Sequence, residues 1–370
     1  MTQIPQRHLF GPGPTNVPGP ILDALAMPTI GHLDPEFLTL MDEVSARLRY
    51  CYQTSNPLTF VMSAPGTIGM EASLTNLLEP GDKAIICING VFGGRMRDIA
   101  QRAGADVVAV ENDWGTPVDP EAVDAALRAH PDAVLLAFVH AETSTGVRSD
   151  AKRLAALGHE YDCLVVADCV TSLSGVPLGV DDWQIDVAYS GSQKCLACVP
   201  GLSPVTYSPR AVERVKARRT PVQSWFGDIS LLANYYESGE KKRAYHHTAP
   251  VNSLYAINEA LRLVESETLA TRWQRHADAA AELYARLESA GLELLVAPAD
   301  RLASLTLVRI PDGVDDAHVR SQLLATRSIE LGAGLGKFAG KAWRIGLMGD
   351  NATKARANFI ADALIEASGR

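Results

Sequence analysis

Hydrophobic positions in the middle of the chain form short, nearly continuous apolar runs, and amphipathic stretches of helical spacing separate these runs. The runs are dense in Val, Leu and Ile, which is typical of strands that are buried on both faces. Alternation of such strands with helices predicts an α/β fold, in which helices cover a mostly parallel sheet. The expected strands are residues 83–88, 106–110, 132–139, 163–168 and 186–190, and the expected helices are 93–104, 120–130 and 150–161.

The pattern changes after about residue 250, where Leu254, Ile257, Leu261 and Val264 keep the spacing of one helix face. A second helix and two further strand–helix pairs follow, which predicts a separate, smaller α+β unit. These later elements are expected at residues 271–291, 304–310, 316–325, 342–347 and 351–367.

Three parts of the chain follow from these patterns. Residues 1–20 contain the proline- and glycine-rich stretch FGPGPTNVPGP, which cannot form a helix interior and is expected to run as an extended arm. Residues 21–267 are expected to form the large domain and residues 268–370 the small C-terminal domain, with the boundary inside a helical connection.

Composition narrows the class of protein. Of the 370 residues 47% are hydrophobic, the formal net charge is -9, and no block of Lys and Arg stands out, so nucleic acid is not an expected partner. No apolar run reaches 18 residues, so no membrane-spanning helix and no membrane partner are expected. The N-terminus lacks the apolar run of a signal peptide, and we expect a cytoplasmic protein.

The stretch YSGSQKCLACVPG at 189–201 places Lys194 directly before Cys195 and Cys198. A zinc site needs about four ligands, and no second Cys-x-x-Cys or His-x3-His supplies the other two. A redox pair normally begins a helix, whereas Val-Pro-Gly follows here. We therefore expect no metal, and we expect the two thiols to pack behind a loop.

Lys194 follows a strand by a Gly-Ser-Gln turn and is flanked by small or apolar residues, which differs from the usual solvated surface lysine. A lysine desolvated at the end of a strand can lose its proton and form a Schiff base with an aldehyde such as pyridoxal phosphate. Asp168 ends the strand CLVVAD, and a carboxylate there suits a protonated pyridine nitrogen, although a helix N-cap or a surface turn is the alternative.

The same cofactor needs a phosphate site and a flat side chain against its ring. The turn before the helix that begins near Ile68 offers backbone N–H groups and the Thr67 hydroxyl to a phosphate. Phe92 follows the strand 83–88 and can lie against a ring, or belong to the core. Because all these residues follow strands of one parallel sheet, we expect them at the same edge.

Taken together, the residues resemble the class V aminotransferases of fold type I, specifically the alanine–glyoxylate and serine–glyoxylate aminotransferase group. The resemblance runs nearly end to end, and its motifs are GPGPTNVP, ETSTGV, VVADCVTSL, SGSQK, YHHTAP and GKAWRIG. It implies a fold type I enzyme whose large domain has a mostly parallel seven-stranded sheet flanked by helices. It also implies pyridoxal phosphate as cofactor and a homodimer with shared active sites.

Carried over by motif, the resemblance implies a role for each residue of the cofactor site. Lys194 would carry the Schiff base, Asp168 would hold the pyridine nitrogen, and Thr143 would hydrogen-bond the phenolic oxygen. Val170 and Phe92 would contact the two ring faces. The phosphate loop would comprise Ala64, Pro65, Gly66 and Thr67 with Gln193 beside them, and Tyr245 and Thr248 would reach the phosphate from the second subunit.

For the substrate, Arg344 would bind the carboxylate, and Gly13 and Thr15 would line the pocket. A bidentate guanidinium is the natural partner of a carboxylate. No second arginine with motif support appears for a distal carboxylate. The implied reaction is therefore transfer of an amino group from a small L-amino acid, alanine or serine, to glyoxylate, giving glycine and a 2-keto acid.

Three other enzyme classes stay open as alternatives. The (S)-ureidoglycine–glyoxylate aminotransferases resemble the chain in IGHLDPEF and GSQKCL, but His32 and Tyr245 stand where that subgroup has glutamine and an amide. A cysteine desulfurase is disfavoured by Phe92 and by the positions of the thiols. A dinucleotide-binding dehydrogenase requires GAGLG at 332–336 to precede a helix, whereas the strand at 342–347 follows it.

Overall fold

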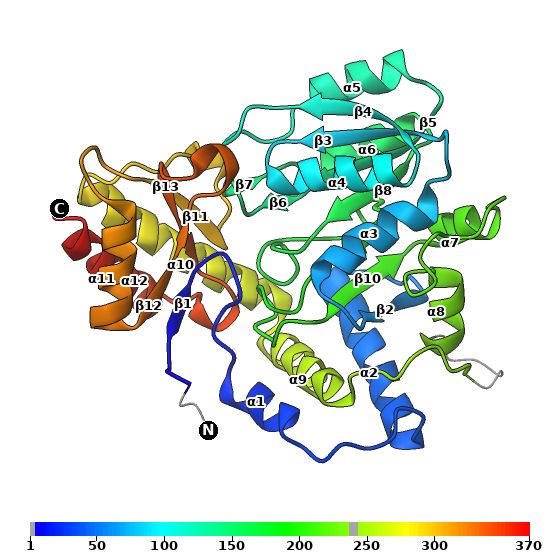
Figure 1. Ribbon diagram of the computed structural model, residues 1–370, viewed down its shortest axis with the longest axis horizontal. Coiled ribbons are helices and arrows are strands. Elements are labelled where there is room, and N and C mark those ends of the chain that lie inside the picture. Colours follow the sequence, from blue (N-terminus) through cyan, green and yellow to red (C-terminus); the bar gives the residue numbers. More distant parts are fainter. Residues whose placement is uncertain (1–3, 237–242) are drawn as a thin grey trace.

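A seven-stranded sheet forms the centre of the large part of the chain (Figure 1). The computed structural model describes residues 4–236 and 243–370. Five strands are parallel neighbours, and β10 runs antiparallel to both of its neighbours, β9 and β2. In spatial order the strands are β2 (Leu58–Met62), β10 (Ser203–Tyr207), β9 (Val187–Tyr189), β8 (Leu164–Asp168), β5 (Ala133–Val139), β3 (Lys83–Ile88) and β4 (Asp106–Glu111).

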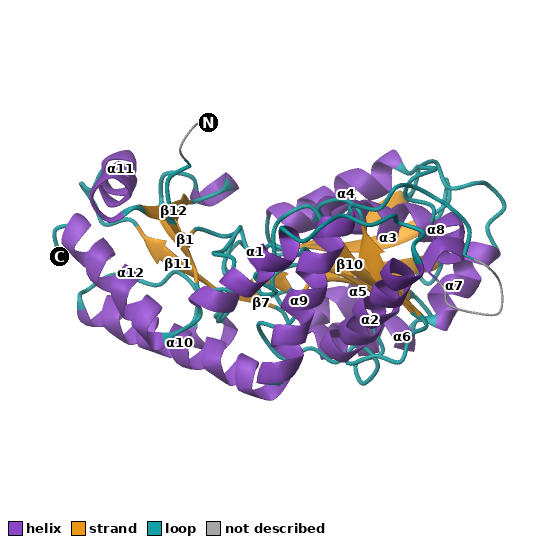
Figure 2. Ribbon diagram, turned by 90° about the horizontal axis from the view of Figure 1, so that it is seen from below, coloured by secondary structure: helices purple, strands orange, loops and turns teal. Residues whose placement is uncertain are grey.

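Helices cover both faces of this sheet, as Figure 2 shows. Most of the apolar runs that predicted strands are buried here on both sides, for example all five residues of β8. For the run at 106–110 this expectation is wrong, because β4 lies at the edge of the sheet and only Val110 of it is buried. These helices are α2 (Pro35–Tyr52), α3 (Gly66–Leu77), α4 (Val91–Arg102), α5 (Pro120–Ala129), α6 (Ala151–Glu160), α7 (Pro209–Lys216), α8 (Ile229–Tyr236) and α9 (Val251–Glu267). The predicted α/β class with a mostly parallel seven-stranded sheet is confirmed.

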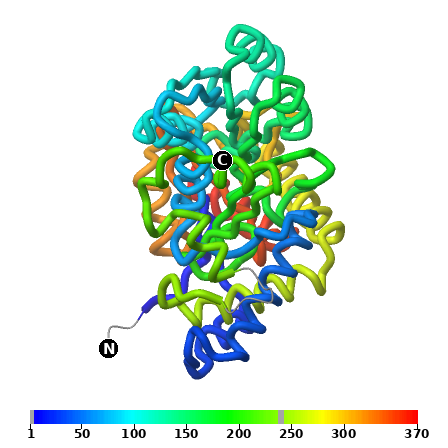
Figure 3. Tube along the Cα trace, turned by 90° about the vertical axis from the view of Figure 1, so that its right-hand side faces the viewer, coloured from blue at the N-terminus to red at the C-terminus, as the bar shows by residue number. Residues whose placement is uncertain are grey.

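The first two helices lie next to α9, the last helix of the large part of the chain. The short helix α1 (Gly19–Leu25) and helix α2 both pack against α9, and these blue and yellow-green segments lie together in Figure 3. A two-stranded ladder of β6 (Ala141–Glu142) and β7 (Val147–Arg148) follows β5. None of the described helices is both long and apolar enough to cross a membrane.

A second sheet of four strands organises the C-terminal part, in the order β1-β12-β13-β11. β1 (His8–Phe10) comes from the predicted arm and pairs in parallel with β12; residues 1–3 of that arm lie outside the described residues. The remaining elements are α10 (Leu269–Ser289), β11 (Leu305–Arg309), α11 (Asp316–Arg327), β12 (Ile329–Ala333), β13 (Ala342–Gly346), α12 (Lys354–Ala367) and three 3-10 turns, Pro298–Asp300, Gly336–Phe338 and Gly349–Asn351.

The two largest hydrophobic cores among the described residues accompany the two sheets. One extends from Ile21 to Leu269, and the other joins Phe10 to side chains between Ala279 and Leu364. The chain passes between them at Thr268, which lies between α9 and α10 with φ of 67°. Phe10 therefore ties the N-terminal segment to the C-terminal core.

Candidate active site

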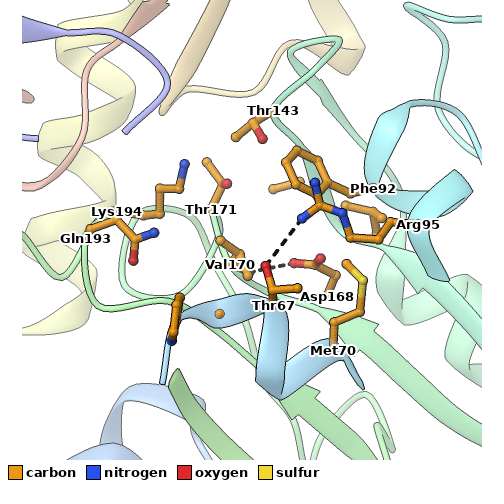
Figure 4. A pocket seen from close by; sticks show the side chains of 14 residues that line it. Thr67, Met70, Phe92, Arg95, Thr143, Asp168, Val170, Thr171, Gln193 and Lys194 are labelled. Atoms are coloured by element: carbon orange, nitrogen blue, oxygen red, sulfur yellow. Dashed lines mark hydrogen bonds between the residues drawn. The ribbon is translucent and has the colours of Figure 1, made fainter. Parts of the chain in front are cut away.

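Lys194 lies at the carboxyl edge of the large sheet, in the turn that follows β9 (Figure 4). Its Nζ donates to the carbonyl oxygen of Pro12, which brings the N-terminal segment over the lysine. Burial lowers the pKa of Lys194 from 10.5 to about 8. A substantial fraction of this amine is therefore neutral near pH 8, as a nucleophilic lysine requires.

Asp168 ends the neighbouring strand β8 and lines the same cavity as Lys194. Its two carboxylate oxygens accept hydrogen bonds from the Val170 N–H at 2.8 Å and from the Tyr189 hydroxyl at 2.9 Å. The side chain is only 2% exposed, and burial raises its pKa to about 7. A buried carboxylate of this kind is stabilised by an adjacent cation, and the protonated nitrogen of a pyridine ring fits that requirement.

The phosphate end of the predicted cofactor site is the start of α3. A Cβ added to Gly66 would lie 3.3 Å from the Ser190 carbonyl oxygen and 3.4 Å from a Val170 methyl, so this backbone lies close against the lysine turn. Pro65 has no N–H to donate, which leaves Gly66 and Thr67 as the first donors of the helix. Among the described residues, Oε1 of the neighbouring Gln193 is buried without a hydrogen-bond partner.

Phe92 and Val170 both line the cavity, where they can contact the two faces of the predicted cofactor ring. Phe92 lies in the first turn of α4, a helix that begins after Gly90 with no cap from its own side chains. Glu142 on β6 and Ser144 in the turn between β6 and β7 cap it. Glu142 accepts from the Phe92 N–H at 3.1 Å, and the Ser144 hydroxyl accepts from the Val91 N–H at 2.9 Å.

Arg344 on β13 joins the small sheet to the site. Its Nη1 donates to the Thr143 carbonyl oxygen at 3.3 Å and its Nε to the Ala333 carbonyl oxygen at 2.7 Å. Burial lowers the pKa of Arg344, while the nearby Glu142 opposes that shift. Nη2 and the second N–H of Nη1 are the donors left to bind a substrate carboxylate.

The N-terminal segment closes the site from the other side. Thr15 donates its N–H to the Gln193 carbonyl oxygen at 3.2 Å and its hydroxyl to the Met348 carbonyl oxygen at 3.0 Å. A Cβ added to Gly13 would lie 2.6 Å from Lys194 Cδ and Nζ, and φ there is +108°. Only glycine fits beside the lysine at this position.

Tyr245 and Thr248 do not reach this cavity within one chain. Both are exposed, Tyr245 by 61%, and neither belongs to the cavity lining. The ring of Tyr245 lies 5.4 Å from that of His32, between ring centroids. Their predicted contact with a phosphate therefore requires a second subunit, and it stays a prediction.

Several lining residues were not singled out from the sequence, namely Met70, Val139, Ala141, Thr171 and Arg95. Arg95 is the one that brings charge. The one available signal was its position three residues after Phe92, which places both on one face of α4.

The thiols next to Lys194 are packed into the protein. The Cys195 thiol donates to the Thr171 carbonyl oxygen at 3.4 Å, and a Cβ added to Gly175 would collide with its sulfur. Burial raises the pKa of Cys195 to about 11 and that of Cys198 to about 12, so near neutral pH both are neutral thiols and poor nucleophiles. The GAGLG stretch ends β12 and leads to a single 3-10 turn, which differs from the helix a dinucleotide loop precedes.

Comparison with known proteins agrees with this geometry. Residues 8–342 match the family model of the class-V aminotransferases. The alanine–glyoxylate aminotransferase of Callithrix jacchus is 41% identical over 365 residues, which cover 98% of this chain and 88% of that protein. The (S)-ureidoglycine–glyoxylate transaminase of Bacillus subtilis is 35% identical over 96% of this chain and 89% of its own length. The crystal structure of an alanine–glyoxylate aminotransferase from Nostoc sp. matches with a TM-score of 0.96 and 48% identity, covering 99% of this chain and 96% of that one.

Proposed function

Because this chain belongs to the class-V aminotransferases, a family of pyridoxal phosphate enzymes, we propose that it transfers the amino group of alanine or serine to glyoxylate. The products are glycine and the 2-keto acid of the donor. The observation that supports this most directly is the pairing of Lys194 with Asp168 in one cavity, with Arg344 bonded to its lining residue Thr143.

Bound pyridoxal phosphate supplies an electron sink for the charge left on the substrate when its α-proton departs. Lys194 supplies the base, since its Nζ, with a pKa of about 8, is able to accept that proton and to return it. Asp168, which is 2% exposed, would hold the pyridine nitrogen of the cofactor in its protonated form. Arg344 holds the substrate carboxylate and so fixes which bond of the α-carbon faces Lys194.

The charges of the site support a small substrate without a second acid group. The cavity of about 220 Å³ is lined by the residues of the cofactor site, and Arg344, Gly13 and Thr15 lie outside its lining. An acidic donor side chain would bury a second charge, and Arg95, the arginine in the cavity lining, lies at Thr67 rather than at the Arg344 end.

A panel of amino donors tests the proposal. Alanine, serine, glutamate, aspartate and (S)-ureidoglycine are compared with glyoxylate and with pyruvate as acceptors, by kcat/KM. Alanine or serine with glyoxylate is expected to be the best pair. A clear preference for a dicarboxylic donor contradicts the proposal.

A second candidate function is amino transfer from (S)-ureidoglycine, which the similarity to the Bacillus subtilis transaminase favours. His32 and Tyr245, the two positions that differ from that subgroup, lie next to each other here. Efficient transfer from ureidoglycine alone in the same panel assigns the chain to this second function.

We also propose that the active form is a homodimer with shared sites. Tyr245 and Thr248 are exposed, and Trp225, which stacks on His246 at 4.4 Å, is 63% exposed, so the surface around YHHT carries large aromatic groups. Such groups are enriched at protein interfaces. If this surface meets the partner's phosphate, each site depends on both chains.

Mixing two inactive variants tests the sharing. Lys194→Ala removes the base, and Thr248→Arg is expected to block the contact to the partner's phosphate. Hybrid dimers contain one site that lacks both substitutions, so activity is expected to return on mixing. Hybrids that form, as shown by differently tagged chains, but that stay inactive contradict the proposal.

A further inference from the structure

Arg95 is a charged residue of the cavity that the mechanism above does not use. It lies on α4, one turn after Phe92, and both side chains line the cavity (Figure 4). Its Nη1 donates to the Thr67 hydroxyl at 3.3 Å, and its guanidinium carbon lies 4.9 Å from the centroid of the Phe92 ring. The guanidinium is thus held between the start of α3 and an aromatic face.

The cofactor phosphate, placed at the start of α3, needs a cation besides Lys194. Three charged residues line it, Arg95, Asp168 and Lys194. Lys194 serves the aldehyde carbon of the cofactor and Asp168 its ring nitrogen, whereas its phosphate brings a charge of about -1.5 to -2 near neutral pH. The start of α3 contributes about half a positive charge. A further cation is needed to neutralise the phosphate.

Arg95 has its charge available for this purpose. Within the described ranges 4–236 and 243–370 it forms no ion pair, and Asp98, the acidic residue one turn further along α4, pairs with Arg102 instead. Glu71 shares a neighbouring hollow with Arg95 but forms no ion pair with it. The caps from Glu142 and Ser144 fix the first turn of α4 and therefore the direction from which Arg95 approaches Thr67.

The alternative partner is a second carboxylate on the substrate. The substrate end of the site is marked by Arg344, which bonds Thr143, whereas Arg95 bonds Thr67 in the phosphate loop. We therefore propose that Arg95 binds the phosphate of pyridoxal phosphate, next to the Thr67 hydroxyl and the N–H groups that begin α3. This rests on the cofactor and is independent of which amino donor the enzyme prefers.

Comparing the affinities for pyridoxal phosphate and for pyridoxal isolates the contribution of the phosphate to binding. Apoprotein is titrated with pyridoxal phosphate and, in parallel, with pyridoxal, which lacks the phosphate, and binding is followed by the change in absorbance. Arg95→Gln is expected to raise the Kd for pyridoxal phosphate by about 10- to 100-fold, as expected for one charge-assisted hydrogen-bonding group, and to leave that for pyridoxal within about twofold. Arg95→Lys, which keeps the charge without the planar fork, is expected to lie between.

Arg97→Gln is the matched control, because Arg97 lies on the same helix and pairs with Glu111 at the surface. It is expected to bind both compounds as the unmodified chain does. If Arg95→Gln weakens the binding of pyridoxal and of pyridoxal phosphate equally, the proposal is overturned. Arg95 would then act by holding the Phe92 ring in place. Unchanged cofactor affinity with weaker inhibition by succinate, a dicarboxylate, overturns it in favour of a substrate role.

Discussion

Asp168→Asn is expected to stabilise the apoprotein and to inactivate the enzyme at the same time. The substitution keeps the shape of the side chain. The amide oxygen still accepts from the Val170 N–H, and the amide nitrogen can donate to the Tyr189 hydroxyl. What it removes is a negative charge in a site that is only 2% exposed. Stability and activity therefore respond to the same charge in opposite directions.

The magnitude follows from the pKa of the carboxyl group, which burial raises from 3.8 to about 7 in the folded apoprotein. A difference of about three units corresponds to about 4 kcal/mol at about 1.36 kcal/mol per unit. Because the folded pKa is the higher one, the stability that Asp168 contributes is fully present below pH 3.8 and is lost as the pH rises through 7. Above pH 7 the apoprotein carries nearly the whole cost of the buried charge.

Urea unfolding of both apoproteins between pH 4 and pH 8, at one protein concentration, measures this term. The advantage of Asp168→Asn over the unmodified chain is expected to grow by at most about 4 kcal/mol over that range. Tyr189→Phe, which removes one donor to the carboxylate, is expected to raise the pKa of Asp168 further. An advantage that does not change with pH refutes the reasoning. Near-normal turnover of Asp168→Asn refutes the role of the charge in holding the pyridine nitrogen protonated.

The remaining predictions concern Lys194, Gly13 beside it, and Glu267 at the end of α9. Lys194→Ala is expected to abolish the covalent link that borohydride traps on the cofactor, and peptide mapping that finds the label on another lysine contradicts the assignment. Gly13→Ala is expected to lower kcat by at least about tenfold, because its Cβ would lie 2.6 Å from the lysine side chain at a positive φ, whereas Gly19→Ala, whose Cβ meets nothing within 4 Å, is the control. Glu267→Gln is expected to cost about 3 kcal/mol at neutral pH, measured by urea unfolding. The hydrogen bond from Arg275 and the charge of Arg272, among other contacts, lower the pKa of Glu267 from 4.5 to about 2. The stability that Glu267 contributes is therefore present above pH 4.5 and is lost as the pH falls through 2. Equal stability of the variant and the unmodified chain at pH 7 contradicts this.

The local elements that repeat a clear period were predictable from the sequence. The strand expected at 83–88 is β3 with the same bounds, and the helix expected at 93–104 is α4, two residues earlier at each end. Two strands of the large sheet, β2 and β10, were not predicted. β10 contains Pro204 and three hydroxyl side chains, so its five residues lack the apolar run that identified the others, and its burial comes from its neighbours.

The chemistry at strand ends was also predictable, because the order of the chain already places Asp168 and Lys194 after two neighbouring parallel strands. The other charged groups depend on contacts between distant segments. Arg95 on α4 contacts Thr67 on α3, and Glu142 on β6 reaches the first turn of α4 although it lies 50 residues later in the chain. The pattern of hydrophobic and polar positions does not predict such contacts, since each residue taken alone is an ordinary charged side chain. The sequence by itself therefore determined the five parallel strands and the placement of Asp168 and Lys194 at their ends. Only the tertiary structure decided which charges surround these two residues, because electrostatic energies depend on distance and burial rather than on position along the chain.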